Sequence, residues 1–70
     1  MNVTIPQFDL IETIREMDVM IKIYRDKHED NHYSFDLYDP EMDEVIWRDL
    51  VKHNNKYDAI SAAKIRMVEL

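Results

Sequence analysis

VMIKIY, residues 19–24, is the stretch that decides the fold class of this chain. Its apolar residues Val19, Ile21 and Ile23 occupy every second position, which is the two-residue period of a half-buried β-strand. A polar turn over residues 27–31 follows, and YSFDLY, residues 33–38, then repeats the same period. The two stretches predict an antiparallel β-hairpin.

The chain beyond this hairpin predicts one more strand. Residues 39–43 contain Pro40, which is favoured early in a type I turn, and so predict a second reversal. A third strand is expected over residues 44–50, with Val45 and Trp47 on the face that packs inward. The opposite register, which turns Trp47 outward, remains an alternative.

Helical spacing appears on both sides of the three predicted strands. Thr4 and Gln7 match the capping-box pattern, and the apolar residues that follow recur at helical intervals, so a helix is expected over residues 5–17. A second amphipathic helix is expected over residues 57–70. Its apolar stripe consists of Ala59, Ile60, Ala63, Met67 and Leu70.

The expected element order is therefore α-β-β-β-α. This order describes an α+β fold, in which a three-stranded antiparallel meander carries two helices on one face. The hydrophobic fraction of 46% and the charged fraction of 34% are typical of a folded domain. No linker or internal repeat divides the chain, so residues 1–70 are expected to form a single domain.

The composition excludes several classes of active site. The chain contains 0 Gly, whereas phosphate-binding loops need glycines to bring backbone N–H groups close to a ligand. It also contains 0 Cys, which excludes thiolate nucleophiles, disulfides, zinc fingers and iron–sulfur sites. No serine stands in a recognisable nucleophile context. We therefore expect no enzyme activity, no catalytic residue and no cofactor.

The histidines offer the clearest alternative to this expectation. His28 and His32 flank the first turn with Glu29 and Asp30 between them, and a metal site would pair both histidines with a carboxylate. A turn presents no fixed helical face, however, and no fourth ligand is evident. We expect solvated histidines and no metal site here, with a pH-dependent role left open because histidine titrates near neutral pH.

Acidic residues dominate the first part of the chain. Residues 1–50 contain 13 acidic and 5 basic side chains, whereas residues 51–70 contain 2 acidic and 4 basic ones. Such a charge repels nucleic acid and attracts the basic surface of another protein. No stretch has the length and apolar character of a membrane span or signal peptide, which indicates a cytoplasmic protein.

Aromatic and acidic side chains fall together on the outward positions of the predicted sheet and its turns. Aromatic anchors inside a charged rim are typical of protein–protein interfaces. The expected partner-binding residues are Tyr24, Asp36, Tyr38, Asp39, Glu41, Asp43, Glu44 and Trp47. Pairing of the same face with a second copy of the chain, giving a homo-oligomer, is the alternative use of this surface.

The start of the last predicted helix resembles a known family. Lys56 and Ala59, followed by Ala62 and Ala63, are similar to the second-helix pattern of the double-stranded-RNA-binding domain, which also has the element order α-β-β-β-α. The resemblance implies that fold and an RNA-binding basic end. Its candidate residues are Lys52, Lys56, Lys64 and Arg66.

The small size and acidic character of the whole chain resemble certain phage-encoded anti-CRISPR and anti-restriction inhibitors. In those families carboxylates imitate DNA phosphates and occupy a basic groove of the host enzyme. The resemblance implies that Asp36, Asp39, Glu41, Asp43 and Glu44 form the mimicking set. The preferred hypothesis is thus an inhibitor that masks a nucleic-acid-binding surface, with an RNA-binding-like module or a structural subunit as alternatives.

Overall fold

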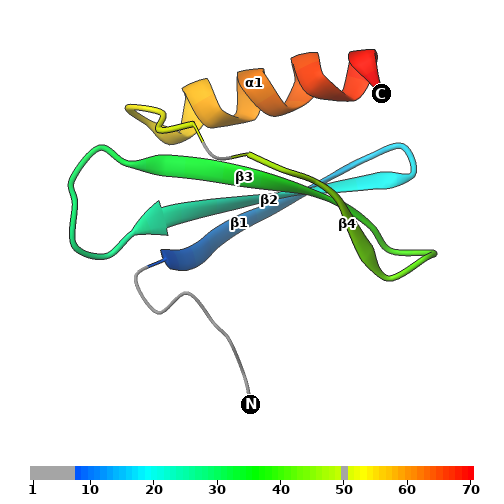
Figure 1. Ribbon diagram of the computed structural model, residues 1–70, viewed down its shortest axis with the longest axis horizontal. Coiled ribbons are helices and arrows are strands. Elements are labelled where there is room, and N and C mark those ends of the chain that lie inside the picture. The colour runs from blue at the N-terminus through cyan, green and yellow to red at the C-terminus, as the bar shows by residue number, and fades with distance from the viewer. Residues whose placement is uncertain (1–7, 50) are drawn as a thin grey trace.

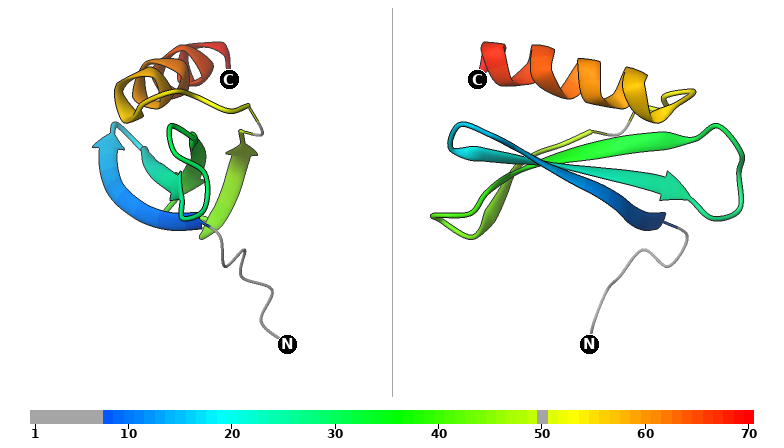
Figure 2. Two further views of the ribbon diagram at one scale, coloured as in Figure 1. Left: turned by 90° about the vertical axis from the view of Figure 1, so that its left-hand side faces the viewer. Right: turned by 180° about the vertical axis from the view of Figure 1, so that it is seen from behind.

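A computed structural model describes residues 8–49 and 51–70 of the chain. Four strands form one sheet and are followed by one helix (Figure 1). The elements are β1 (Phe8–Glu16), β2 (Val19–Asp26), β3 (Tyr33–Asp39), β4 (Glu44–Arg48) and α1 (Lys56–Glu69). The sheet is antiparallel with the spatial order β1-β2-β3-β4, and Figure 2 shows its strong twist.

The α+β class is confirmed, but the expected order α-β-β-β-α is wrong. Residues 8–16 of the predicted first helix form β1, so the sheet has four strands, and α1 is the only helix in the described part of the chain. The predicted capping box at residues 4–7 lies outside the described residues. Among the described residues, no helix has the length and apolar character that a membrane crossing requires.

A β-bulge explains why β1 resembles a helix in the sequence. The register of β1 against β2 shifts between Leu10 and Glu12, and Ile11 is the additional residue. The bulge breaks the two-residue period, so the apolar positions 10, 11 and 14 fall at intervals that fit a helix. Ile14 faces Ile21 across the strands and is the β1 residue that packs against the core.

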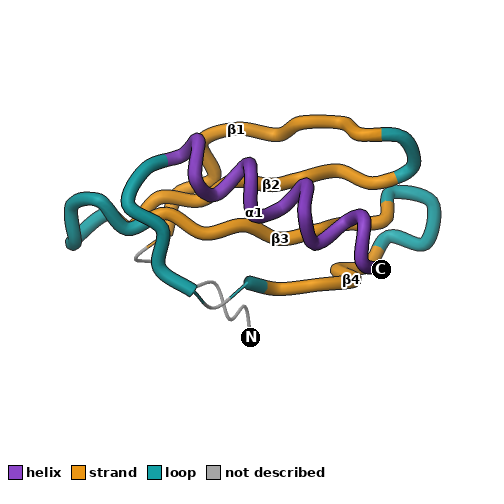
Figure 3. The backbone as a smooth tube through the Cα atoms, turned by 90° about the horizontal axis from the view of Figure 1, so that it is seen from above, coloured by secondary structure: helices purple, strands orange, loops and turns teal. Residues whose placement is uncertain are grey.

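The core lies between the two central strands and α1 (Figure 3). Its buried residues are Ile21, Ile23, Phe35, Leu37, Ala59 and Ala63. The two alanines are one helical turn apart, and their small side chains let the helix approach the sheet closely. The structure confirms the predicted hairpin as β2 and β3. It also confirms the helix predicted at residues 57–70 as α1, and the ends of these elements shift only slightly.

Three residues other than glycine take positive φ angles in the described chain, namely Met17 (φ 56), Asn31 (φ 58) and Asp43 (φ 55). Asn and Asp accept this left-handed backbone region more readily than most residues. Asn31 and Asp43 accordingly lie in two predicted turns. Met17 occupies the β1–β2 turn, which the helix prediction concealed.

Candidate interaction surface

The eight predicted partner-binding residues do not form one surface. Asp39, Glu41, Asp43 and Glu44 lie in or beside the β3–β4 turn. Tyr24, Asp36 and Tyr38 belong to the sheet face opposite α1, which we call the outer face. Trp47 pairs with the buried Leu37 and therefore lies on the face that α1 covers.

A second β-bulge explains the position of Trp47. The register of β3 against β4 shifts between Leu37 and Tyr38, so Trp47 faces Leu37 while Val45 faces Tyr38. Val45 and Trp47 consequently lie on opposite faces, in contrast to the expectation that they share one. The Arg66 guanidinium carbon lies 4.1 Å from the centre of the Trp47 ring, a cation–π contact that joins α1 to β4.

Asp36 is buried and already paired. It is only 5% exposed, and its two carboxylate oxygens accept hydrogen bonds of 3.2 Å each from Nε and Nη2 of Arg48. Burial and the neighbouring Asp36 carboxylate both raise the pKa of Tyr24. Because its charge is satisfied within the sheet, Asp36 is unsuited to the phosphate-mimicking role that the sequence suggested.

The β3–β4 turn is held by its own carboxylates. Oδ1 of Asp39 accepts the backbone N–H groups of Glu41 (2.9 Å) and Met42 (3.3 Å), which is the pattern of an Asx turn. The Tyr38 hydroxyl donates to Asp43, and this bond is the main reason why the pKa of Tyr38 is raised. These hydrogen bonds fix the conformation of the turn and so the positions of its carboxylates.

Most carboxylates elsewhere have a cationic partner. Of the 15 acidic residues, eight lie within 4 Å of a lysine, arginine or histidine nitrogen in the described structure. The exceptions are Asp18, Asp30, Asp39, Glu41, Asp43, Glu44 and Asp58. Four of these seven carboxylates fall between residues 39 and 44, a segment that we call the acidic turn. Negative charge that the described protein does not itself compensate is therefore concentrated there.

Exposed apolar side chains accompany the acidic turn. Met42 at its tip is 64% exposed, and Val45 and Ile46 at the start of β4 are 42% and 37% exposed. β4 is also an edge strand of the sheet, with all five of its residues exposed. The acidic turn and this edge together provide a charged rim beside accessible apolar area, the composition of a protein-binding surface.

The predicted basic end is neutralised within the molecule. The Lys56 ammonium lies 3.0 Å from a Glu12 carboxylate oxygen, and Lys64 lies 3.7 Å from Glu16. The bond to Glu12 is the main cause of the raised pKa of Lys56. The remaining two cations of this set are Lys52, which pairs with Glu29, and Arg66, which pairs with Glu69. The pairs of Lys52, Lys56 and Lys64 join α1 and its preceding loop to the rest of the fold, whereas Arg66 and Glu69 both belong to α1.

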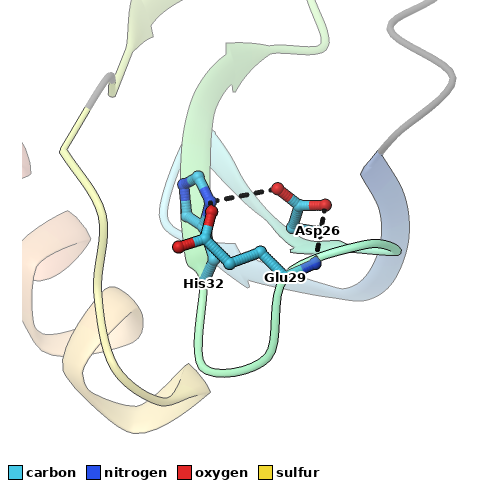
Figure 4. A group of neighbouring side chains, drawn as sticks. All are labelled: Asp26, Glu29 and His32. Carbon is cyan, nitrogen blue, oxygen red and sulfur yellow. Dashed lines mark hydrogen bonds and ion pairs between the residues drawn. The ribbon is translucent and has the colours of Figure 1, made fainter.

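The loop between β2 and β3 contains a cluster that differs from the histidine pair weighed in the sequence, because it joins His32 to Asp26 and Glu29 and leaves His28 out. Asp26, Glu29 and His32 converge at the end of the sheet opposite the acidic turn (Figures 1 and 4). His28 is exposed as expected, whereas the His32 side chain is 20% exposed and contacts both carboxylates. His53 is also largely buried and binds Asp49 at 2.8 Å. The sequence pointed to His32 and a neighbouring carboxylate but not to Asp26, because only the loop conformation brings positions 26, 29 and 32 together.

Comparison with known proteins found no matching protein family, curated protein or solved structure.

Proposed function

We propose that this chain is a non-enzymatic interaction domain whose acidic turn binds the basic surface of another protein. The observation that carries the proposal is the group of four carboxylates without a cationic partner among the described residues, beside exposed Met42, Val45 and Ile46. Uncompensated charge speeds the encounter with an oppositely charged partner, and desolvated apolar side chains then hold the complex.

The partner we favour is a nucleic-acid-binding surface, which the acidic turn would mask. Such surfaces gather lysine and arginine to neutralise phosphates, and clustered carboxylates present the same sign of charge. Met42, Val45 and Ile46 take the anchoring role expected for Tyr24, Tyr38 and Trp47, because they are exposed next to the acids. Trp47 is similarly exposed, but its ring lies on the face that α1 covers and is occupied by Arg66. A cytoplasmic location, expected because no stretch of the sequence has the character of a signal peptide or a membrane span, belongs to this proposal.

The RNA-binding alternative receives less support. It depended on a helix at the start of the domain, but residues 8–16 form the strand β1. It also depended on Lys52, Lys56 and Lys64, each of which is paired with a glutamate. Phosphates would have to displace these internal partners before they could be bound. Assembly with a second copy of the chain is a further alternative, and light scattering over a range of concentrations would detect it.

The test compares two variants that lose the same three negative charges from the net charge of −6. One variant, Glu41→Gln/Asp43→Asn/Glu44→Gln, changes the acidic turn, and the control, Asp18→Asn/Asp30→Asn/Asp58→Asn, changes unpaired acids elsewhere. The probe is a labelled arginine-rich DNA-binding peptide followed by fluorescence anisotropy. We expect the turn variant to bind at least about tenfold more weakly, the control to bind as the wild type, and salt to weaken both.

Two outcomes would contradict the proposal. Equal weakening of both variants would show that net charge alone attracts the peptide. Failure of the wild-type chain to displace labelled duplex DNA from the peptide would remove the masking function. A salt-dependent shift of duplex RNA that Lys56→Ala abolishes would instead support the RNA-binding alternative.

A further inference from the structure

Three potential metal-ligand atoms meet in the β2–β3 loop. Asp26, Glu29 and His32 each offer one ligand atom within 4.8 Å of the others, and the shortest contacts of the group join Nδ1 of His32 to Oδ2 of Asp26 and to Oε2 of Glu29 (Figure 4). Nδ1 lies 3.1 Å from Oδ2 of Asp26 and 3.6 Å from Oε2 of Glu29. Ligands of a tetrahedral ion with bonds of roughly 2.0–2.1 Å are separated by about 3.3 Å, so both distances suit a shared ion.

A hydrogen bond explains only one of the two short distances from Nδ1 of His32. Nδ1 of His32 can carry a single proton, and its bond to Asp26 uses that proton. A separation of 3.6 Å from Glu29 is too long for a hydrogen bond. Lys52 binds the other oxygen of Glu29, Oε1, and therefore leaves Oε2 directed toward the histidine.

The surroundings prepare Asp26 to act as a ligand. Its Oδ1 accepts the backbone N–H groups of His28 (2.8 Å) and Glu29 (3.3 Å), which leaves Oδ2 turned toward His32. The bond from His28 is the main cause of the lowered pKa of Asp26, so this carboxylate stays ionised. Partners of this kind fix the orientation of metal ligands and raise the affinity of their sites.

His32 and Glu29 are positioned in a similar way. The Phe8 ring meets the His32 ring edge-on, with 5.3 Å between the ring centres, and limits its rotation. The hydrogen bond from Lys52 is the main cause of the lowered pKa of Glu29, which keeps this second carboxylate charged. Asp26 and Glu29, but not His32, also line a hollow of about 400 Å³ that opens to solvent beside the cluster.

We propose that Asp26, Glu29 and His32 bind a divalent ion of the zinc type through Oδ2, Oε2 and Nδ1, with water from the hollow completing the coordination. A mixed set of imidazole and carboxylate ligands suits Zn²⁺ better than Mg²⁺, which prefers oxygen ligands alone. The ion takes the lone pair of Nδ1 in the neutral ring, so the proton that Nδ1 shares with Asp26 in the ion-free chain moves to Nε2. The ion would clip the end of β2 to the start of β3, at the opposite end of the sheet from the acidic turn.

The experiment uses the full chain after treatment with a chelator. Calorimetry with ZnCl₂ is expected to give one ion per chain and a raised melting temperature, with no comparable effect of MgCl₂. His32→Gln and Glu29→Gln should each weaken zinc binding by at least about tenfold. The matched control is His28→Gln, which removes an exposed histidine from the same loop and should bind zinc as the wild type does.

NMR of the unmodified chain gives a readout that does not depend on any variant being folded. Zinc should shift the ¹⁵N resonance of His32 Nδ1 far more than that of its Nε2, because Nδ1 is the atom that faces the two carboxylates. The proposal is overturned if zinc perturbs His28 or His53 instead, if His28→Gln and His32→Gln lose equal affinity, or if Mg²⁺ binds as well as Zn²⁺.

Discussion

The two connections of β3 are both acidic, but apart from Asp30 their carboxylates have opposite surroundings. In the loop before β3, Asp26 and Glu29 are bound by backbone N–H groups, His32 and Lys52. In the acidic turn after β3, the carboxylates bind only groups of the turn itself and the hydroxyl of Tyr38, with no cationic partner among the described residues.

This contrast arises from tertiary structure rather than local composition. Lys52, which neutralises Glu29, comes 23 residues later in the chain and reaches the β2–β3 loop because the segment before α1 passes beside it. No segment returns to the acidic turn in the same way within the described structure. Acidic residues of similar spacing therefore stabilise the fold at one end of the sheet and remain available to a partner at the other.

Asp36, which lies in β3 between the two connections, should give the largest loss of stability. Asp36→Ala removes a buried carboxylate and both hydrogen bonds to Arg48. We expect the free energy of unfolding to fall by about 2 kcal/mol, since hydrogen bonds to charged groups contribute ~1.5–3 kcal/mol. Urea denaturation followed by circular dichroism measures the change.

Glu44→Ala is the matched control for this variant. Glu44 lies on the same hairpin but has no cationic partner among the described residues, so its removal should change the free energy of unfolding by less than about 0.5 kcal/mol. Equal losses for Asp36→Ala and Glu44→Ala would show that the distinction between paired and unpaired carboxylates has no energetic basis.

Asp26 should make stability depend on pH in the acidic range. Its pKa in the folded protein lies below the ordinary value of 3.8, mainly because of the hydrogen bond from the His28 backbone. Its contribution is therefore complete above pH 3.8 and is lost as the pH falls through the lower folded pKa. Urea midpoints of the wild type and Asp26→Asn should differ most near neutral pH and converge in acid. A constant difference would contradict this assignment.

The sequence predicted the elements whose period is regular. β2, β3 and α1 follow uninterrupted periods of two or of three to four residues, so their positions and buried faces were evident, except that Leu70 of the predicted helical stripe lies beyond α1 and is 60% exposed. β1 and β4 each contain a bulge, which adds one residue and reverses the face of everything beyond it. The helix predicted for β1 and the shared face predicted for Val45 and Trp47 both failed for this reason.

The candidate sites were predictable to different degrees. The acidic turn was evident because its carboxylates are consecutive in the chain and need no distant partner to be close together. The burial of Asp36 could not be inferred, because it depends on the register that brings Arg48 beside it. The cluster of Asp26, Glu29 and His32 depends on a loop conformation for which no periodic pattern exists.

The smallest change in stability is expected for the acidic turn itself. In Glu41→Gln/Asp43→Asn/Glu44→Gln no ion pair of the described structure is lost, and Asn at position 43 still accepts the positive φ of 55. Asp39, whose carboxylate holds the turn, is unchanged. We expect the free energy of unfolding to stay within about 0.5 kcal/mol of the wild type at moderate ionic strength.

Repeating the urea titration in low salt tests whether these carboxylates repel one another or support the fold. Removal of three neighbouring like charges relieves repulsion that salt would otherwise screen, so any gain in stability should appear at low ionic strength and disappear as salt is added. A large loss of stability in either condition would mean that these carboxylates support the fold. Unchanged or slightly raised stability together with weakened peptide binding would assign these carboxylates to recognition, because the fold then does not need them.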